Sequence, residues 1–139
     1  MSMPTTILII DDDPDFREFV RIVLESRDYA VLEAGNAEDG LRLIRDDLPA
    51  LVLLDAMMSY ELAGVGIIRS VRENPKLAHI PLILISAVLS QDEDRFLPAD
   101  ERTMVNRFLT KPISPDQLLA EIAGTLAEKA EHPHTPRRP

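Results

Sequence analysis

Residues 6–13 of the chain read TILIIDDD, a short apolar run that ends at three consecutive aspartates. A run that is apolar on both faces is typical of a strand buried on both sides, as in a parallel sheet. Asp13 and Pro14 then predict the start of a helix, with the aspartate as N-cap and the proline at the first helical position. This stretch therefore predicts a buried strand, an acidic turn and a helix in succession.

The same unit of a short apolar run and a longer amphipathic stretch recurs along the sequence. Strands are expected at residues 6–10, 29–34, 51–54, 80–85 and 107–109. Further helix starts are indicated by Asn36 with Asp39, and by Ser114 and Pro115 with Gln117, because both groups resemble a capping box. Five such units predict an α/β fold with a five-stranded parallel sheet, flavodoxin-like and doubly wound, in strand order 2-1-3-4-5.

Length and composition indicate one domain. The chain has 139 residues, of which 45% are hydrophobic, enough to form a core. We expect the domain to occupy residues 1–128 and a flexible, proline-rich tail to occupy residues 129–139. A helix is expected at residues 64–73. The segment at 90–106 is polar, contains Pro98 and lacks a 3.6-residue period, so it is the least regular of the expected helical segments.

Charge and composition also narrow the classes of partner. The net charge is −9, from 15 basic and 24 acidic side chains, and there is no cysteine. A strongly acidic chain is repelled by phosphate backbones and anionic lipids, so neither direct nucleic-acid binding nor membrane binding is expected. The lack of cysteine excludes disulfides and thiol catalysis. The chain has no apolar run near the roughly 20 residues of a membrane span and no secretory signal pattern, so we expect a cytoplasmic location.

Polar side chains stand where four of the expected strands end. Asp11 and Asp12 follow the first strand, Asp55 follows the third, Ser86 the fourth and Lys111 the fifth. In an open α/β sheet these positions meet in one crevice. Carboxylates brought close together repel each other, and a hard cation such as Mg²⁺ offsets that repulsion. A carboxylate beside Mg²⁺ and a lysine can also attack a phosphoryl group and form an aspartyl phosphate.

Four motifs at these strand ends resemble those of a known family. IIDDDP (9–14), LLDAMM (53–58), LIS (84–86) and FLTKP (108–112) resemble the receiver domain of bacterial two-component response regulators, and the resemblance covers about residues 6–127. It implies a signalling switch rather than an enzyme. Such a domain accepts a phosphoryl group from a sensor histidine kinase or phosphotransfer protein. It then changes its binding to a downstream protein target, in some cases as a homodimer.

The resemblance also implies a role for individual residues. Asp55 is implied to be the phosphoacceptor. The implied ligands of Mg²⁺ are Asp11, Asp12, Asp55 and the backbone carbonyl of Met57. Ser86 and Lys111 are implied to bind the phosphoryl oxygens, and Ser86 and Phe108 to form a switch in which the aromatic ring moves inward. An aromatic residue at a strand end is otherwise most often part of the core. The Lys111–Pro112 peptide bond is implied to be cis.

The sequence departs from the family pattern in the loop after Asp55. Ser59 stands where proline is usual, Ala63 stands where an acid is usual, and the loop at 59–64 is one residue longer. Met104 also stands where the family often has glycine. These departures leave open a second interpretation, a phosphorylation-independent interaction module with the receiver fold.

An enzyme of another family is a third interpretation. Phosphatases of the haloacid-dehalogenase type also place a nucleophilic aspartate after a first strand, with a second acid two residues later. Asp11 and Asp13 have this spacing, but Asp15 stands where that family usually has threonine or valine. Its chains are also generally longer, so this interpretation is the weakest of the three.

Overall fold

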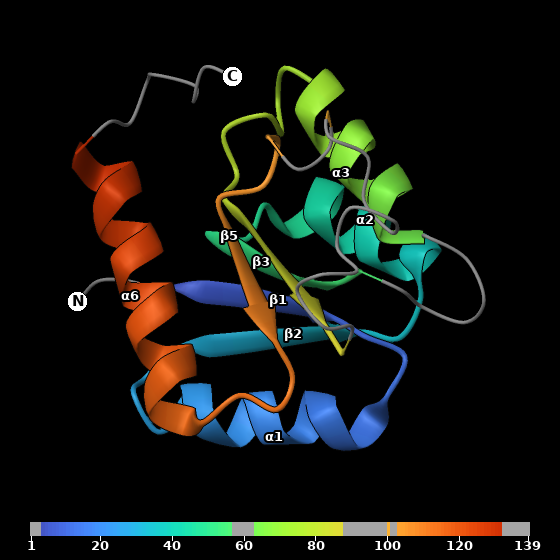
Figure 1. Cartoon of the computed structure of the whole chain (residues 1–139). Helices are drawn as coiled ribbons and strands as arrows, with labels where there is room; N and C mark the ends of the chain where they lie inside the picture. Colours follow the sequence, from blue (N-terminus) through green and yellow to red (C-terminus); the bar gives the residue numbers. More distant parts are fainter. Residues whose placement is uncertain (1–3, 57–62, 88–99, 101–102, 132–139) are drawn as a thin grey trace.

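The computed structural model describes residues 4–56, 63–87, 100 and 103–131, and its strands form one parallel sheet (Figure 1). The strands are β1 (Thr6–Ile10), β2 (Ala30–Ala34), β3 (Leu51–Asp55), β4 (Leu82–Ser86) and β5 (Arg107–Thr110). Their order in the sheet is β2-β1-β3-β4-β5. This confirms the predicted fold class, a five-stranded, doubly wound α/β sheet.

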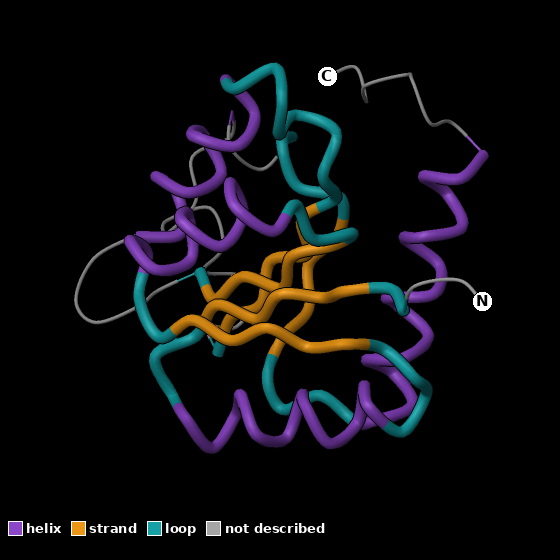
Figure 2. The backbone as a smooth tube through the Cα atoms, turned by 180° about the vertical axis from the view of Figure 1, so that it is seen from behind, coloured by secondary structure: helices purple, strands orange, loops and turns teal. Residues whose placement is uncertain are grey.

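Helices cover both faces of the sheet. They are α1 (Pro14–Glu25), α2 (Ala37–Asp47), α3 (Ala63–Glu73) and α6 (Pro115–Glu131). Seen from behind, the sheet lies between two layers of helices (Figure 2). Alternate residues of β1 face opposite layers: Ile7 and Ile9 pack with α1 and α6, and Leu8 and Ile10 pack with α2 and α3. Burial on both faces explains why β1 is apolar along its whole length.

The helix starts predicted from the sequence are confirmed in detail. Asp13 caps α1 by accepting a hydrogen bond from the backbone N–H of Asp15. Asn36 caps α2 through the N–H of Asp39, and the Ser114 hydroxyl accepts from the N–H of Gln117 at the start of α6. Each cap satisfies one backbone donor that the first helical turn leaves unpaired.

Several predicted strand boundaries differ from the structure by one or two residues. The fourth strand begins at Leu82 rather than residue 80, because Ile80 donates its N–H back to Leu77 and Pro81 has no N–H to donate. Helix α6 continues to Glu131, and no proline interrupts it after Pro115. The expected domain boundary at residue 128 stays a prediction. Residues 132–139, and most of the helix expected at 90–106, lie outside the described residues.

A half-buried arginine, Arg72, contacts the segments that precede β4 and β5. The side chain of Arg72 on α3 donates to the carbonyl oxygens of Met104 (2.8 Å), Ala78 (3.0 Å) and Ile80 (2.7 Å), and to Oδ1 of Asn106 (3.2 Å). Burial lowers the pKa of Arg72 to about 10, so the guanidinium remains charged at neutral pH. The side chain therefore joins α3 to the segments that lead into β4 and β5. No helix in the described part of the chain is long and apolar enough to cross a membrane.

Replacing Arg72 by lysine tests this connection. A lysine ammonium cannot reproduce the planar fork, so Arg72→Lys leaves carbonyl acceptors unpaired and should lower the free energy of unfolding by about 2–3 kcal/mol. Arg42→Lys is the matched control, because its ion pair with Asp39 on α2 is exposed. The control should change stability by less than about 0.5 kcal/mol. Urea denaturation of both variants measures the difference, and equal stabilities would contradict the role of Arg72.

Candidate functional site

Three carboxylates meet at the carboxyl end of the sheet. Asp11 and Asp12 directly follow β1, Asp55 is the last residue of β3, and these two strands are neighbours. One ligand oxygen from each carboxylate lies within 4.8 Å of the other two. Asp11 is fully buried, Asp55 is 8% exposed and Asp12 is exposed. The ends of two neighbouring strands therefore bring together the three acids that the sequence predicts for the site.

Asp11 has a hydrogen-bond donor on each oxygen of its carboxylate. Oδ1 accepts from the backbone N–H of Asp13 at 2.9 Å, and Oδ2 accepts from Nζ of Lys111, also at 2.9 Å. A carboxylate buried without such partners would carry a large desolvation cost. The Lys111 ammonium thus compensates the buried charge of Asp11, although the two residues are 100 positions apart in the sequence.

Lys111 is held at both ends. Its backbone N–H donates to the carbonyl oxygen of Ser86 at 2.8 Å, and the following peptide bond to Pro112 is cis, as the resemblance implied. At the other end, Nζ lies 4.2 Å from the centre of the Phe16 ring, a cation–π distance. The side chain therefore points into the acidic site.

The structure describes the positions of two of the remaining predicted site residues but not of the third. Ser86 is the last residue of β4 and lies opposite Thr110 of β5. Its side chain is half-buried, and its backbone carbonyl accepts the N–H of Lys111. Phe108 on β5 is 37% exposed, so in this structure its ring lies on the surface rather than in the core. Met57, whose carbonyl was predicted as a metal ligand, lies outside the described residues. The functional roles of Ser86 and Phe108 stay predictions.

The donor set fits a hard divalent cation. All three clustered groups are carboxylates, and oxygen ligands of this kind suit Mg²⁺ rather than a soft metal. Two such charges 4.8 Å apart repel by about 3 kcal/mol at an effective dielectric constant near 20. Lys111 offsets part of that repulsion, and a bound cation would offset more of it.

Comparison with known proteins decides the family. The sequence model of the response regulator receiver domain matches residues 7–123. The chain belongs to the response regulator receiver domain family. This family is a signalling module rather than a catalytic enzyme, which argues against the dehalogenase-type phosphatase interpretation. The acidic site described above is the type of site that phosphoacceptor receiver domains contain.

Relatives of this receiver domain include both short and longer proteins. A 14.6 kDa protein from the sodA1 3′ region of Leptolyngbya boryana is 40% identical over 113 residues, which are 81% of this chain and 83% of that protein. Response regulator Rre1 of Synechocystis sp. is 33% identical over 130 residues, 93% of this chain but only 54% of that protein. The CheY-like receiver domain crystal structure from Methanospirillum hungatei superposes with a TM-score of 0.81 at 23% identity, covering 94% of this chain and 99% of that one. The last comparison supports the fold alone.

Sequence reasoning missed several groups that surround the receiver site. The sequence patterns assign no site role to Phe16 or Arg17, both on α1. The available signal was Glu33, a charged residue inside a strand expected to be apolar on both faces. Such a residue requires a partner, and Arg17 is one of its partners.

Gly64 is a further missed residue, and it lies against the backbone of the candidate phosphoacceptor. A Cβ added at Gly64 would lie 2.9 Å from the carbonyl oxygen of Asp55 and 3.0 Å from that of Ala56. Both contacts are with backbone, which cannot move aside as a flexible side chain would. The start of α3 can therefore approach the end of β3 only because this position has no side chain.

We expect Gly64→Ala to destabilise this receiver domain. The added methyl group should displace the backbone at Asp55 and lower the free energy of unfolding by about 1–3 kcal/mol. Gly66→Ala is the matched control on the same helix, because a Cβ there meets no heavy atom within 4 Å. That control should raise stability by about 0.5–1 kcal/mol through helix propensity. Urea denaturation distinguishes the two, and a stabilised Gly64→Ala variant would show that the close approach is absent.

Proposed function

We propose that this receiver domain is the phosphoacceptor switch of a two-component phosphorelay, with Asp55 as the residue that is phosphorylated. The observation that carries the proposal is the cluster of Asp11, Asp12 and Asp55, with the Lys111 ammonium hydrogen-bonded to Asp11. Asp55 is 8% exposed, whereas Asp11 is fully buried and Asp12 is exposed. The partial exposure of Asp55 supports its assignment over Asp11, and the resemblance to receiver domains supports it over Asp12.

The proposed reaction is a phosphoryl transfer from a phosphohistidine. A carboxylate oxygen of Asp55 forms a bond to phosphorus while the bond between phosphorus and the histidine nitrogen breaks. The electron pair of that bond stays on the imidazole, which takes up a proton. Lys111 is close enough to the cluster to pair with the transferred phosphoryl oxygens, and Ser86, on the neighbouring strand end, would donate its hydroxyl to them.

The carboxylates of Asp11, Asp12 and Asp55 would hold Mg²⁺ in this scheme, together with the backbone carbonyl of Met57. The ion supplies positive charge that neutralises the phosphoryl oxygens. The protein's own contribution is to hold the three negatively charged carboxylates close enough together to bind one cation. Asp13 and Lys111 provide that contribution at Asp11, because each donates to one of its two carboxylate oxygens.

The output of the switch is proposed to be a change in protein binding. Phosphorylation of Asp55 adds negative charge beside Ser86 and Lys111, which biases the position of the Ser86 hydroxyl. Phe108 is the proposed responding group, since its exposed ring lies on the edge strand β5 that also leads into Lys111. The proposed partners are a sensor histidine kinase or phosphotransfer protein and a downstream protein target, in the cytoplasm.

A mass measurement tests this function. Wild-type protein incubated with acetyl phosphate and Mg²⁺ should gain the mass of one phosphoryl group on Asp55, and chelation of Mg²⁺ should prevent the gain. Asp55→Asn should show no gain, because an amide is not a nucleophile toward phosphorus. Asp46→Asn, an exposed acid near the end of α2, is the control and should label as wild type does.

The same experiment distinguishes the second interpretation. A wild-type protein that stays unlabelled under conditions in which another receiver domain labels would reject the phosphoacceptor function. It would then favour a phosphorylation-independent interaction module. Labelling that persists in Asp55→Asn would instead place the acceptor elsewhere.

A further inference from the structure

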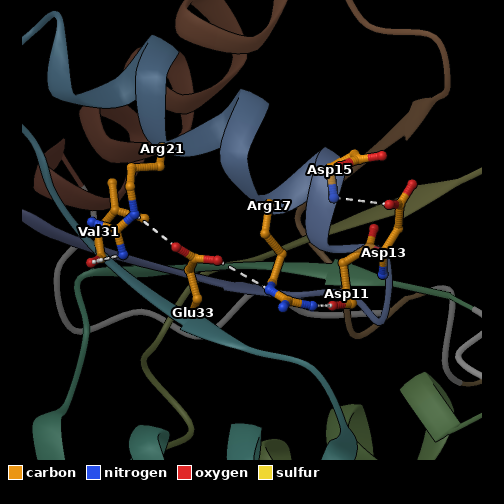
Figure 3. Close-up of polar contacts among 7 residues, drawn as sticks. All are labelled: Asp11, Asp13, Asp15, Arg17, Arg21, Val31 and Glu33. Atoms are coloured by element: carbon orange, nitrogen blue, oxygen red, sulfur yellow. Dashed lines mark hydrogen bonds and ion pairs between the residues drawn. The ribbon is translucent and has the colours of Figure 1, made fainter.

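A network of polar groups joins Asp11, α1 and β2 (Figure 3). Its central member is Arg17, in the first turns of α1. Nη1 of Arg17 donates to the backbone carbonyl oxygen of Asp11 at 2.6 Å, and Nε donates to Oε1 of Glu33 at 3.0 Å. One planar guanidinium therefore connects the main chain of a site residue to a carboxylate on the edge strand.

Glu33 is itself firmly placed. Its second oxygen, Oε2, accepts from Nε of Arg21 at 2.7 Å, and Nη2 of Arg21 donates to the carbonyl oxygen of Val31 at 3.2 Å. The hydrogen bond from Arg21, and also that from Arg17, lowers the pKa of Glu33 against the opposing effect of burial. Glu33 thus stays ionised and gives Arg17 a fixed partner on β2.

Gly35 leaves the space that Arg17 occupies. A Cβ added at Gly35 would lie 3.2 Å from Nη1 of Arg17, the atom that donates to Asp11. The neighbouring residue, Ala34, accepts the backbone N–H of Asp11 at 3.0 Å. The end of β2 therefore fixes both backbone polar groups of Asp11, the N–H directly and the carbonyl through Arg17 and Glu33.

We propose that Arg17 is a positioning residue for the metal and phosphoryl site. It holds the main chain of Asp11, so that the carboxylates of Asp11 and Asp12 stay directed at the position of the cation. The inference rests on the proposed function in one respect, the identity of Mg²⁺ as the ion. Arg17 itself donates to the backbone of Asp11 and not to its carboxylate, so it acts on the site only through Asp11.

Removal of Arg17 has two opposite effects on the affinity of the site for a metal ion. Loss of the hydrogen bond to Asp11 releases the main chain and weakens metal binding, whereas loss of a positive charge near the carboxylates strengthens it. Arg17→Lys separates them, because lysine keeps the charge but cannot donate to the Asp11 carbonyl and to Glu33 with one rigid fork. Arg21→Lys is the matched control, since Arg21 is on the same helix and pairs with the same Glu33 but has no hydrogen bond to Asp11.

The first measurement is made without metal. The backbone N–H of Asp13 donates to Oδ1 of Asp11, so its hydrogen exchange reports how well Asp11 is held. We expect exchange at Asp13 to be faster in Arg17→Lys than in Arg21→Lys and wild type. Equal exchange in the two variants overturns the proposal, whatever the protein binds.

The second measurement is a titration of each variant with Mg²⁺, followed by NMR. We expect Arg17→Lys to weaken the apparent affinity by about 5- to 10-fold, the lower end for groups that orient metal ligands, and Arg21→Lys to change it by less than about 2-fold. Similar affinities in the two variants would contradict the role of Arg17. A wild-type protein that binds no Mg²⁺ would contradict the proposed function instead, and exchange at Asp13 would then still decide whether Arg17 positions Asp11.

Discussion

The structure depends on the compensation of one fully buried charge, the carboxylate of Asp11. Each of its oxygens accepts one hydrogen bond at 2.9 Å, from the backbone of Asp13 and from the ammonium of Lys111. An ionised carboxylate without such donors would cost several kcal/mol in the interior, and Asp55 close by adds a like charge. Asp13 does two tasks at this point, because its side chain caps α1 while its N–H supports Asp11.

This compensation spans several strands of the sheet. Lys111 follows β5 at the edge of the sheet, and β3 and β4 lie between that edge and β1. The backbone of Lys111 is fixed on β4 through Ser86, and its side chain crosses toward Asp11 with Phe16 beside the ammonium. A compact charge on a long stem suits this reach. The site is thus largely a consequence of topology, because Asp11, Asp55 and Lys111 come from segments far apart in the sequence.

The sequence predicts those parts of the site that follow from local patterns, namely where strands end and where helices begin. Strand ends are marked by apolar runs that stop at acids, and helix starts by capping residues such as Asn36 and Ser114. These local signals predicted the order of the strands and the clustering of the three aspartates. Contacts made by long polar side chains did not follow. The partners of Arg72 come from two segments, and the partner of Arg17 on β2 depends on how α1 packs. Such contacts require the register and tilt of whole elements, which a pattern of apolar residues does not specify.

Two of the groups missed by sequence reasoning, Gly64 and Arg17, act on the backbone of the site rather than on its carboxylates. Gly64 allows α3 to approach the carbonyl of Asp55 closely, and Arg17 donates a hydrogen bond to the carbonyl of Asp11. The carboxylates themselves must remain available to a cation and a phosphoryl group, so their position has to be set from behind. A motif of acids, hydroxyl and lysine therefore identifies the chemistry of a receiver site. How firmly that chemistry is held depends on a glycine and an arginine that bear no reactive group.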